Sequence, residues 1–178
     1  MWHPFENVPA GPRLATFWIL TGLNLLILAV LGSLYLPLEN STAPQGIISL
    51  ELATTPERLN DIVSSWSEEP KMGMAFSLGL NFLCLLTLTN ALALACVLAA
   101  GRLSGAVSKL GILLAWIQWA AGVLWAVQNS LLAWAVLGHA TPFGVTLASL
   151  LAMVKFALVG IGLLYAVVAG GAAAMRRR

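Results

Sequence analysis

Four long apolar runs constrain the fold of this chain more than any other feature. They cover approximately residues 14–37, 73–100, 108–137 and 143–170. A helix needs about 20 predominantly apolar residues to cross a bilayer, and each run is long enough. The chain is 60% hydrophobic and only 9% charged, whereas roughly a quarter of the residues in a soluble domain carry a charge. The sequence therefore predicts an integral membrane protein with four transmembrane helices.

The segments between the runs predict how the helices are ordered. Short connections join the second, third and fourth runs, and short connections make consecutive helices antiparallel neighbours. We therefore expect an all-α, transmembrane, up-down-up-down four-helix bundle that forms one domain over residues 1–178. The first run is too long for a removable signal peptide and lacks a small-residue cleavage site before a soluble part, so we expect it to act as a signal anchor.

The charged residues outside the runs predict the orientation of the chain. One set is cationic and flanks the runs on one side: Arg13, Arg102, Lys109 and residues 176–178. The connection at residues 38–72 carries six carboxylates against Arg58 and Lys71. Because cytoplasmic segments have an excess of Lys and Arg, we expect both termini in the cytoplasm and the 38–72 loop outside. In a bacterium this corresponds to a multi-pass protein of the inner membrane.

The 38–72 loop contains two segments with a structural preference of their own. Residues 46–53 (GIISLELA) are β-prone. Thr55 and Pro56 are typical helix-start residues, and they precede an apolar stripe at positions i, i+3, i+4 and i+7: Leu59, Ile62, Val63 and Trp66. We expect a short amphipathic helix at the outer surface. Its stripe is either a plain connector surface, a lid over a ligand pocket or a surface for a partner.

Lys155 lies in the middle of the fourth run, with no other charged residue within ten positions. At 100° per residue it shares a helix face with small residues: Gly144, Ala148, Ala152, Gly162 and Ala166. Small residues let a neighbouring helix approach closely, so Lys155 should point at protein. A charge at the bilayer centre costs about 2.5–3.5 kcal/mol on insertion scales. We therefore expect Lys155 to have a partner or a role.

Polar residues on the second and third predicted helices should lie at a similar depth to this lysine. The predicted cluster beneath the outer loop consists of Lys155, Asn81, Gln128, Asn129, Trp125 and Ser77. Three interpretations are open. The side chains form interhelical hydrogen bonds that set helix register, they bind the polar head of a lipophilic molecule, or Lys155 acts in catalysis as a base or a Schiff-base amine.

The sequence lacks the motifs that several classes of function require. His3 and His139 lie on opposite predicted sides of the membrane, which excludes a bis-histidine haem inside the bundle. Cys84 and Cys96 are about 18 Å apart along one predicted helix and cannot form a disulfide with each other. The sequence has no P-loop, no HExxH and no nucleophile elbow. We predict no metal site, no catalytic residue and no nucleic-acid partner, and the sequence does not identify a cofactor.

Four segments resemble a family of small, uncharacterised, four-span bacterial membrane proteins. They are GIISLELATTPERLNDIVSSW, SLGLNFLCLL, LAWIQWAAGVLWAVQN and VKFALVGIGLLY. The family pattern reads SLGLDFLF and LDAVEN, with acidic residues where this chain has Asn81, Trp125 and Gln128, and it keeps the lysine at Lys155. The resemblance implies no activity. It implies that carboxylate partners of Lys155 have been replaced here, which favours a binding or structural role over acid–base chemistry.

Two functions follow as hypotheses. The first is a non-catalytic protein of the inner membrane that acts as an accessory or assembly subunit of a larger membrane complex. Its partners are the lipid bilayer and other membrane protein subunits. The alternative is an enzyme or carrier that binds a lipophilic small molecule, such as an isoprenoid, a quinone or a fatty-acid derivative, in an outer-side pocket around Lys155.

Overall fold

The computed structural model describes residues 2–175, and every regular element in that part is helical. The four long helices are α1 (Ala10–Tyr35), α4 (Glu68–Ala100), α5 (Gly105–Trp134) and α6 (Pro142–Met175). The two short helices are α2 (Ile47–Glu51) and α3 (Pro56–Ser64). Single turns of 3-10 helix cover Pro4–Asn7 and Leu36–Leu38, and a π-helical turn covers Ala135–His139.

Each long helix belongs to a segment that is long and apolar enough to cross a membrane. These segments are Ala10–Leu38, Glu68–Ala100, Gly105–His139 and Pro142–Ala172. The predicted all-α four-helix class is therefore confirmed, and the chain is a multi-pass membrane protein. α4 begins at Glu68 rather than at residue 73. Acidic residues in a first helical turn complement the positive end of the helix dipole, and a proline is tolerated there, so Glu68, Glu69 and Pro70 extend the helix.

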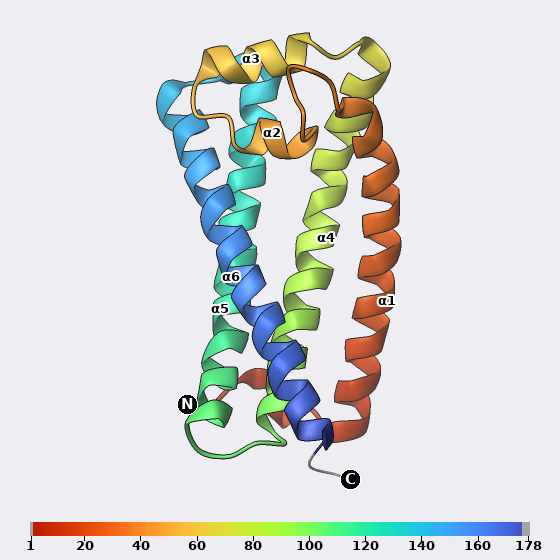
Figure 1. The fold of residues 1–178 in the computed structure, drawn as a ribbon, viewed down its shortest axis with the longest axis vertical. Helices are drawn as coiled ribbons and strands as arrows, with labels where there is room; N and C mark the ends of the chain where they lie inside the picture. The colour runs from red at the N-terminus through yellow and green to blue at the C-terminus, as the bar shows by residue number, and fades with distance from the viewer. Residues whose placement is uncertain (1, 176–178) are drawn as a thin grey trace. The chain divides into compact units, whose positions relative to one another are not determined.

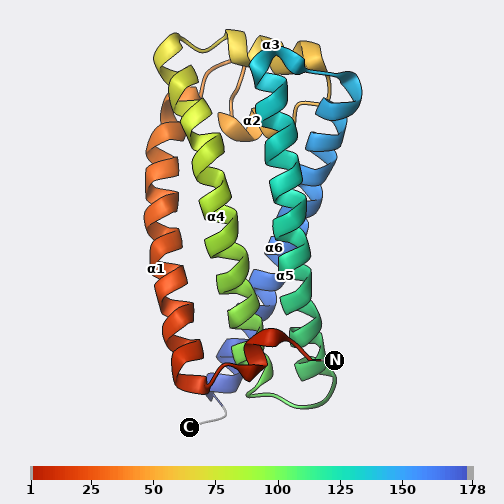
Figure 2. The same cartoon turned by 180° about the vertical axis from the view of Figure 1, so that it is seen from behind.

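By its internal contacts the chain divides into two compact units. Unit 1 comprises Met1–Asn24, Leu86–Val123 and Lys155–Arg178, and unit 2 comprises Leu25–Leu85 and Leu124–Val154. Each long helix contributes one segment to each unit, so each unit contains four long-helix segments. Within a unit, successive segments alternate in direction, as an up-down-up-down order requires (Figures 1 and 2). The single domain expected from the sequence stays a prediction.

Unit 2 is closed at one end by α2 and α3 (Figure 1). α3 begins as the sequence predicts, because the Thr55 hydroxyl accepts a hydrogen bond from the backbone N–H of Arg58 at 3.2 Å and Pro56 occupies the first helical position. Its apolar stripe packs inward: Leu59, Ile62 and Trp66 are buried, and Val63 is partly buried against the same core. The indole N–H of Trp66 donates to the carbonyl oxygen of Leu38 at 2.8 Å. This packing fits a lid.

The β-prone segment at residues 46–53 does not form a strand. It forms α2 instead, which buries Ile47, Leu50 and Glu51 on one face at positions i, i+3 and i+4. A single strand would leave its backbone N–H and C=O groups unpaired, and the described part of the chain has no other strand to pair with it. One helical turn satisfies these groups locally, so the tertiary setting overrides the β-propensity.

Unit 1 has a second core made largely of small residues. Ala93, Cys96, Ala100 and Ala115 pack with Ile112, Tyr165 and Ala169. Two glycines mark the closest approaches in this unit. A Cβ atom on Gly111 would collide with the Tyr165 ring, and one on Gly162 would collide with the side-chain amide of Gln118. That amide donates to the carbonyl oxygen of Leu158 on α6 at 3.0 Å, so a glycine allows the α5–α6 hydrogen bond.

Replacing Gly162 by leucine should destabilise the protein. The new side chain would displace the Gln118 amide, and overpacking of this kind typically costs about 1–3 kcal/mol. Equilibrium unfolding in detergent micelles measures the change. Gly160→Leu is the matched control, because a Cβ atom there meets no atom within 4 Å, and it should leave the free energy of unfolding nearly unchanged. Equal losses in both variants would contradict the assigned packing.

Candidate functional site

The structure buries the polar side chains of the predicted cluster. Lys155 is 1% exposed, and Ser77, Asn81, Gln128 and Asn129 are also buried. Trp125 is partly buried, against a small core formed by Ile27, Leu31 and Cys84. Lys155 therefore faces protein, as its helix face predicts. It belongs to unit 1 and the other five residues belong to unit 2, so a cluster that includes the lysine stays a prediction.

Within unit 2, three members of the cluster form hydrogen bonds. The Asn129 amide on α5 donates to the carbonyl oxygen of Leu78 on α4 at 2.6 Å. The Tyr35 hydroxyl on α1 donates to Oδ1 of Asn81 on α4 at 3.4 Å. The Ser77 hydroxyl donates to the carbonyl oxygen of Met74 in its own helix at 2.7 Å. These bonds join α1 and α5 to the same stretch of α4.

Two atoms of this arrangement are buried without a hydrogen-bond partner among the described residues. They are the amide nitrogen Nδ2 of Asn81 and the amide oxygen Oδ1 of Asn129. One is a donor and the other an acceptor. The Asn129 amide donates to the carbonyl oxygen of Leu78, and Asn81 lies one helical turn after Leu78. Both amides therefore lie along the same part of α4. A group that carries both a donor and an acceptor would satisfy them.

Tyr35 and Glu51 lie beside this arrangement, although the sequence pattern did not predict either of them there. Glu51 is 5% exposed at the end of α2, close enough to Tyr35 for the two side chains to interact electrostatically. One sequence signal was available, because Glu51 stands between Leu50 and Leu52 in an apolar segment. Buried carboxylates require paired or hydrogen-bonded surroundings, so an acidic residue on the buried face of α2 indicates a polar environment inside unit 2.

Lys155 has an aromatic neighbour in its own unit. Its ammonium nitrogen Nζ lies 4.8 Å from the centroid of the Phe156 ring. A cation near an aromatic ring at this distance is attracted by the ring quadrupole. The buried residues Ala148 and Ala152 precede it on the same face of α6, so part of the predicted small-residue stripe faces protein as well.

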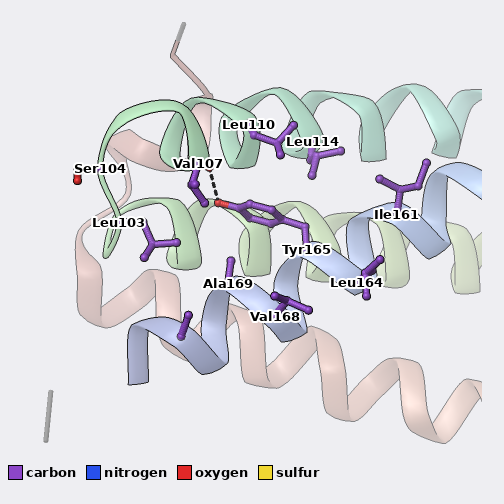
Figure 3. Close-up of a pocket in the computed structure, with 11 residues that line it drawn as sticks. Leu103, Ser104, Val107, Leu110, Leu114, Ile161, Leu164, Tyr165, Val168 and Ala169 are labelled. Atoms are coloured by element: carbon purple, nitrogen blue, oxygen red, sulfur yellow. Dashed lines mark hydrogen bonds between the residues drawn. The ribbon is translucent and has the colours of Figure 1, made fainter. Parts of the chain in front are cut away.

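A groove of about 580 Å³ lies in unit 1 between α5 and α6. Figure 3 shows that its walls are mainly aliphatic side chains, with the ring of Tyr165 across its middle. The Tyr165 hydroxyl donates to the carbonyl oxygen of Val107 at 2.9 Å. The groove therefore offers mainly apolar contact, with the hydroxyls of Tyr165 and Ser104 as its polar groups. No residue of the predicted polar cluster lines it.

The N-terminal segment, which the charge pattern predicts to be cytoplasmic, contains a buried histidine. His3 is 0% exposed, and its ring lies near Trp116 and Trp119 of α5, with ring centroids 5.0 and 4.6 Å away. Its Nδ1 atom accepts a hydrogen bond from the backbone N–H of Phe5 at 3.2 Å, and its own backbone N–H donates to the Glu6 carboxylate at 2.7 Å. Both tryptophans are more than 110 positions away in the sequence, so no local pattern signals these contacts.

Burial lowers the pKa of His3 below its ordinary value of 6.5, although the charge of Glu6 acts in the opposite direction. The neutral ring is therefore the form that the folded segment prefers. A protonated ring also loses the acceptor that holds the Phe5 N–H. The unfolded segment takes up the proton first as pH falls, so the stability that His3 contributes is present above pH 6.5 and is lost at lower pH.

Acidification should release the N-terminal segment from α5. Tryptophan fluorescence of the reconstituted protein, followed from about pH 8 to about pH 5, should show a transition from Trp116 and Trp119. His3→Phe keeps an aromatic ring and should abolish the transition. His139→Phe should retain it, although His139 stacks on Trp134 with centroids 4.1 Å apart. An unchanged transition in His3→Phe would show that another group titrates.

Comparison with known proteins identifies no relative of this chain. No family model, curated protein or solved structure matches the chain. In the part of the chain that the structure describes, no group of three or more His, Cys, Asp and Glu residues is placed to hold a metal ion. The resemblance to a small four-span bacterial family therefore stays a prediction, and the candidate site rests on its geometry.

Proposed function

We propose that this protein is a non-catalytic, multi-pass protein of a bacterial inner membrane that acts as an accessory or assembly subunit of a larger membrane complex. The observation that carries the proposal is the exposed face of α1. Only 17% of the most apolar window of this helix is buried, against 61% for α4. α1 therefore leaves most of its surface available to lipid or to another helix.

The exposed face of α1 has a small-residue pattern. Gly11, Ala15 and Gly22 recur at steps of four and seven residues and are all exposed. A Cβ atom on Gly11 or Gly22 would meet no atom within 4 Å. Transmembrane helices associate through such small residues because their backbones can approach closely. This face suits a partner helix from another subunit.

The buried polar side chains support a structural role. The Gln118 amide joins α5 to α6, the Asn129 amide joins α5 to α4, and the Asn24 amide on α1 donates to the Thr87 hydroxyl on α4 at 3.0 Å. Interhelical hydrogen bonds of this kind contribute about 0.6 kcal/mol each on average in a membrane. They serve to set helix register rather than to perform chemistry.

Gly22→Leu should remove the partner without unfolding the protein, because the new side chain enters open space in the isolated chain and blocks an approaching helix. Native mass spectrometry of protein extracted gently from its own membranes measures the effect. The wild type should arrive with a stoichiometric protein partner and Gly22→Leu without it. Gly160→Leu, an equally exposed glycine on α6, should retain the partner. A wild type that arrives without any protein partner would reject the proposal.

A second function, binding of a lipophilic molecule with a polar head, is favoured by one observation. The buried donor of Asn81 and the buried acceptor of Asn129 have no hydrogen-bond partner among the described residues. An unmade hydrogen bond at a buried polar atom costs about 1–3 kcal/mol. A hydroxyl, a protonated carboxyl or an amide on a lipophile would recover this energy.

Asn81→Leu and Lys155→Met test this alternative. If a lipophile binds here, a defined compound should co-purify with the wild type, and Asn81→Leu should lose it while the helices stay folded. Lys155→Met should lose it as well if the lysine belongs to the site. Lys109→Met, at an exposed position, is the control. Lipid extraction and absorption spectra detect the compound, and equilibrium unfolding measures stability. If the variants change only the free energy of unfolding, the cluster has a structural role alone.

A further inference from the structure

Two arginines line one small pocket of unit 1, where α1 begins and α4 ends. The pocket has a volume of about 250 Å³. The residues that line it are Ala10, Arg13, Leu14, Leu98, Gly101 and Arg102. Figure 2 shows the start of α1 and the end of α4 at the same end of this unit. We call this feature the di-arginine pocket.

The N-terminal segment holds Arg13 in a fixed orientation. Its Nε atom donates to the carbonyl oxygen of Val8 at 3.2 Å, and its Nη2 atom donates to the carbonyl oxygens of Val8 and Glu6 at 2.7 and 2.8 Å. A guanidinium has five N–H donors, and the two on Nη1 make no hydrogen bond to a described residue. The side chain of Arg13 therefore has a fixed orientation, and its Nη1 atom is available to donate hydrogen bonds to a ligand.

The charge of this pocket is not neutralised by the described residues. Lys71 forms an ion pair with Glu68, and neither arginine forms an ion pair with a carboxylate of a described residue. The carboxylate of Glu6, the acidic residue nearest to Arg13 in the sequence, accepts a hydrogen bond from the His3 backbone N–H instead. Arg102 is exposed. Two positive charges thus face one cavity, beside the positive end of the α1 dipole at Ala10.

The pocket lies at the level of lipid headgroups. Arg13 is in the first turn of the membrane-spanning segment Ala10–Leu38, and Arg102 follows the segment Glu68–Ala100 by two residues. The ends of such segments meet the polar interface of a bilayer. Leu14 and Leu98 supply apolar walls in the same pocket. Cationic side chains above apolar walls match an amphiphile with an anionic head.

We propose that the di-arginine pocket binds the phosphodiester group of an anionic phospholipid. The guanidinium groups of Arg13 and Arg102 donate to the phosphate oxygens, for which their planar fork is well suited. The lipid's acyl chain begins along Leu14 and Leu98. No carboxylate at the pocket is available for an ammonium headgroup, so an anionic lipid is preferred over a zwitterionic one. Basic pockets between transmembrane helices are a known form of lipid recognition.

Native mass spectrometry of the full chain in detergent, titrated with phosphatidylglycerol or phosphatidylethanolamine, tests the proposal. The wild type should bind phosphatidylglycerol more tightly, and the preference should fall as salt is added. Arg102→Gln should weaken phosphatidylglycerol binding about tenfold or more, because a charge-assisted hydrogen bond is lost. Arg102→Lys should give an intermediate loss, since it keeps the charge but not the fork. Arg13→Gln should also weaken binding, with circular dichroism to check the fold.

Lys109→Gln is the matched control. It removes one exposed positive charge from the first turns of α5, outside the pocket, and should leave binding unchanged. Equal binding of the two lipids, or an equal loss in Lys109→Gln and Arg102→Gln, would overturn the proposal in favour of general surface attraction. Binding of inorganic phosphate to the lipid-free protein with the same dependence on Arg102 would assign the pocket to free phosphate and would also overturn it.

Discussion

The need to satisfy every polar group without water is the constraint on which the rest of this structure depends. In the hydrocarbon core of a bilayer, backbone N–H and C=O groups must be paired inside the protein. The described chain meets this condition with helices alone. The β-prone segment 46–53 lies outside the membrane-spanning segments, and it forms α2 because one helical turn pairs its backbone groups locally. Side chains follow the rule as well, since the Asn129 and Gln118 amides donate to main-chain carbonyls of neighbouring helices. These bonds tie helices together without providing reactive groups.

Small residues make those bonds reachable. Gly162 leaves room for the Gln118 amide, and Gly111 leaves room for the Tyr165 ring. Exposed glycines have a different consequence, because Gly22 and Gly160 face open space. Glycines that face protein fix the internal packing of unit 1, whereas those that face outward leave smooth surfaces for lipid or for another helix. The inward-facing glycines thus belong to the internal architecture of unit 1, whereas the outward-facing glycines bear on the proposed association with other subunits.

Three regions contain polar or ionisable groups in addition to apolar packing, and these groups differ from one region to the next. In unit 2, the amides of Asn81 and Asn129 each keep a buried polar atom without a hydrogen-bond partner among the described residues, and the carboxylate of Glu51 is also buried. The ring of His3 packs against Trp119, and burial lowers the pKa of this histidine below its ordinary value. The di-arginine pocket is lined by two cationic side chains and lies where α1 begins and α4 ends.

The sequence by itself determined the features that depend on local composition and periodicity. The length of the apolar runs specifies four membrane-spanning helices, Thr55 and Pro56 specify the start of α3, and the stripe from Leu59 to Trp66 specifies its buried face. The helix face of Lys155 likewise predicts that the lysine points at protein. Only the tertiary structure decided which distant residues meet. His3 beside Trp119, Glu51 beside Tyr35, and Arg13 with Arg102 in one pocket join segments whose proximity has no local signature, because contacts between helices depend on packing that a single sequence does not display.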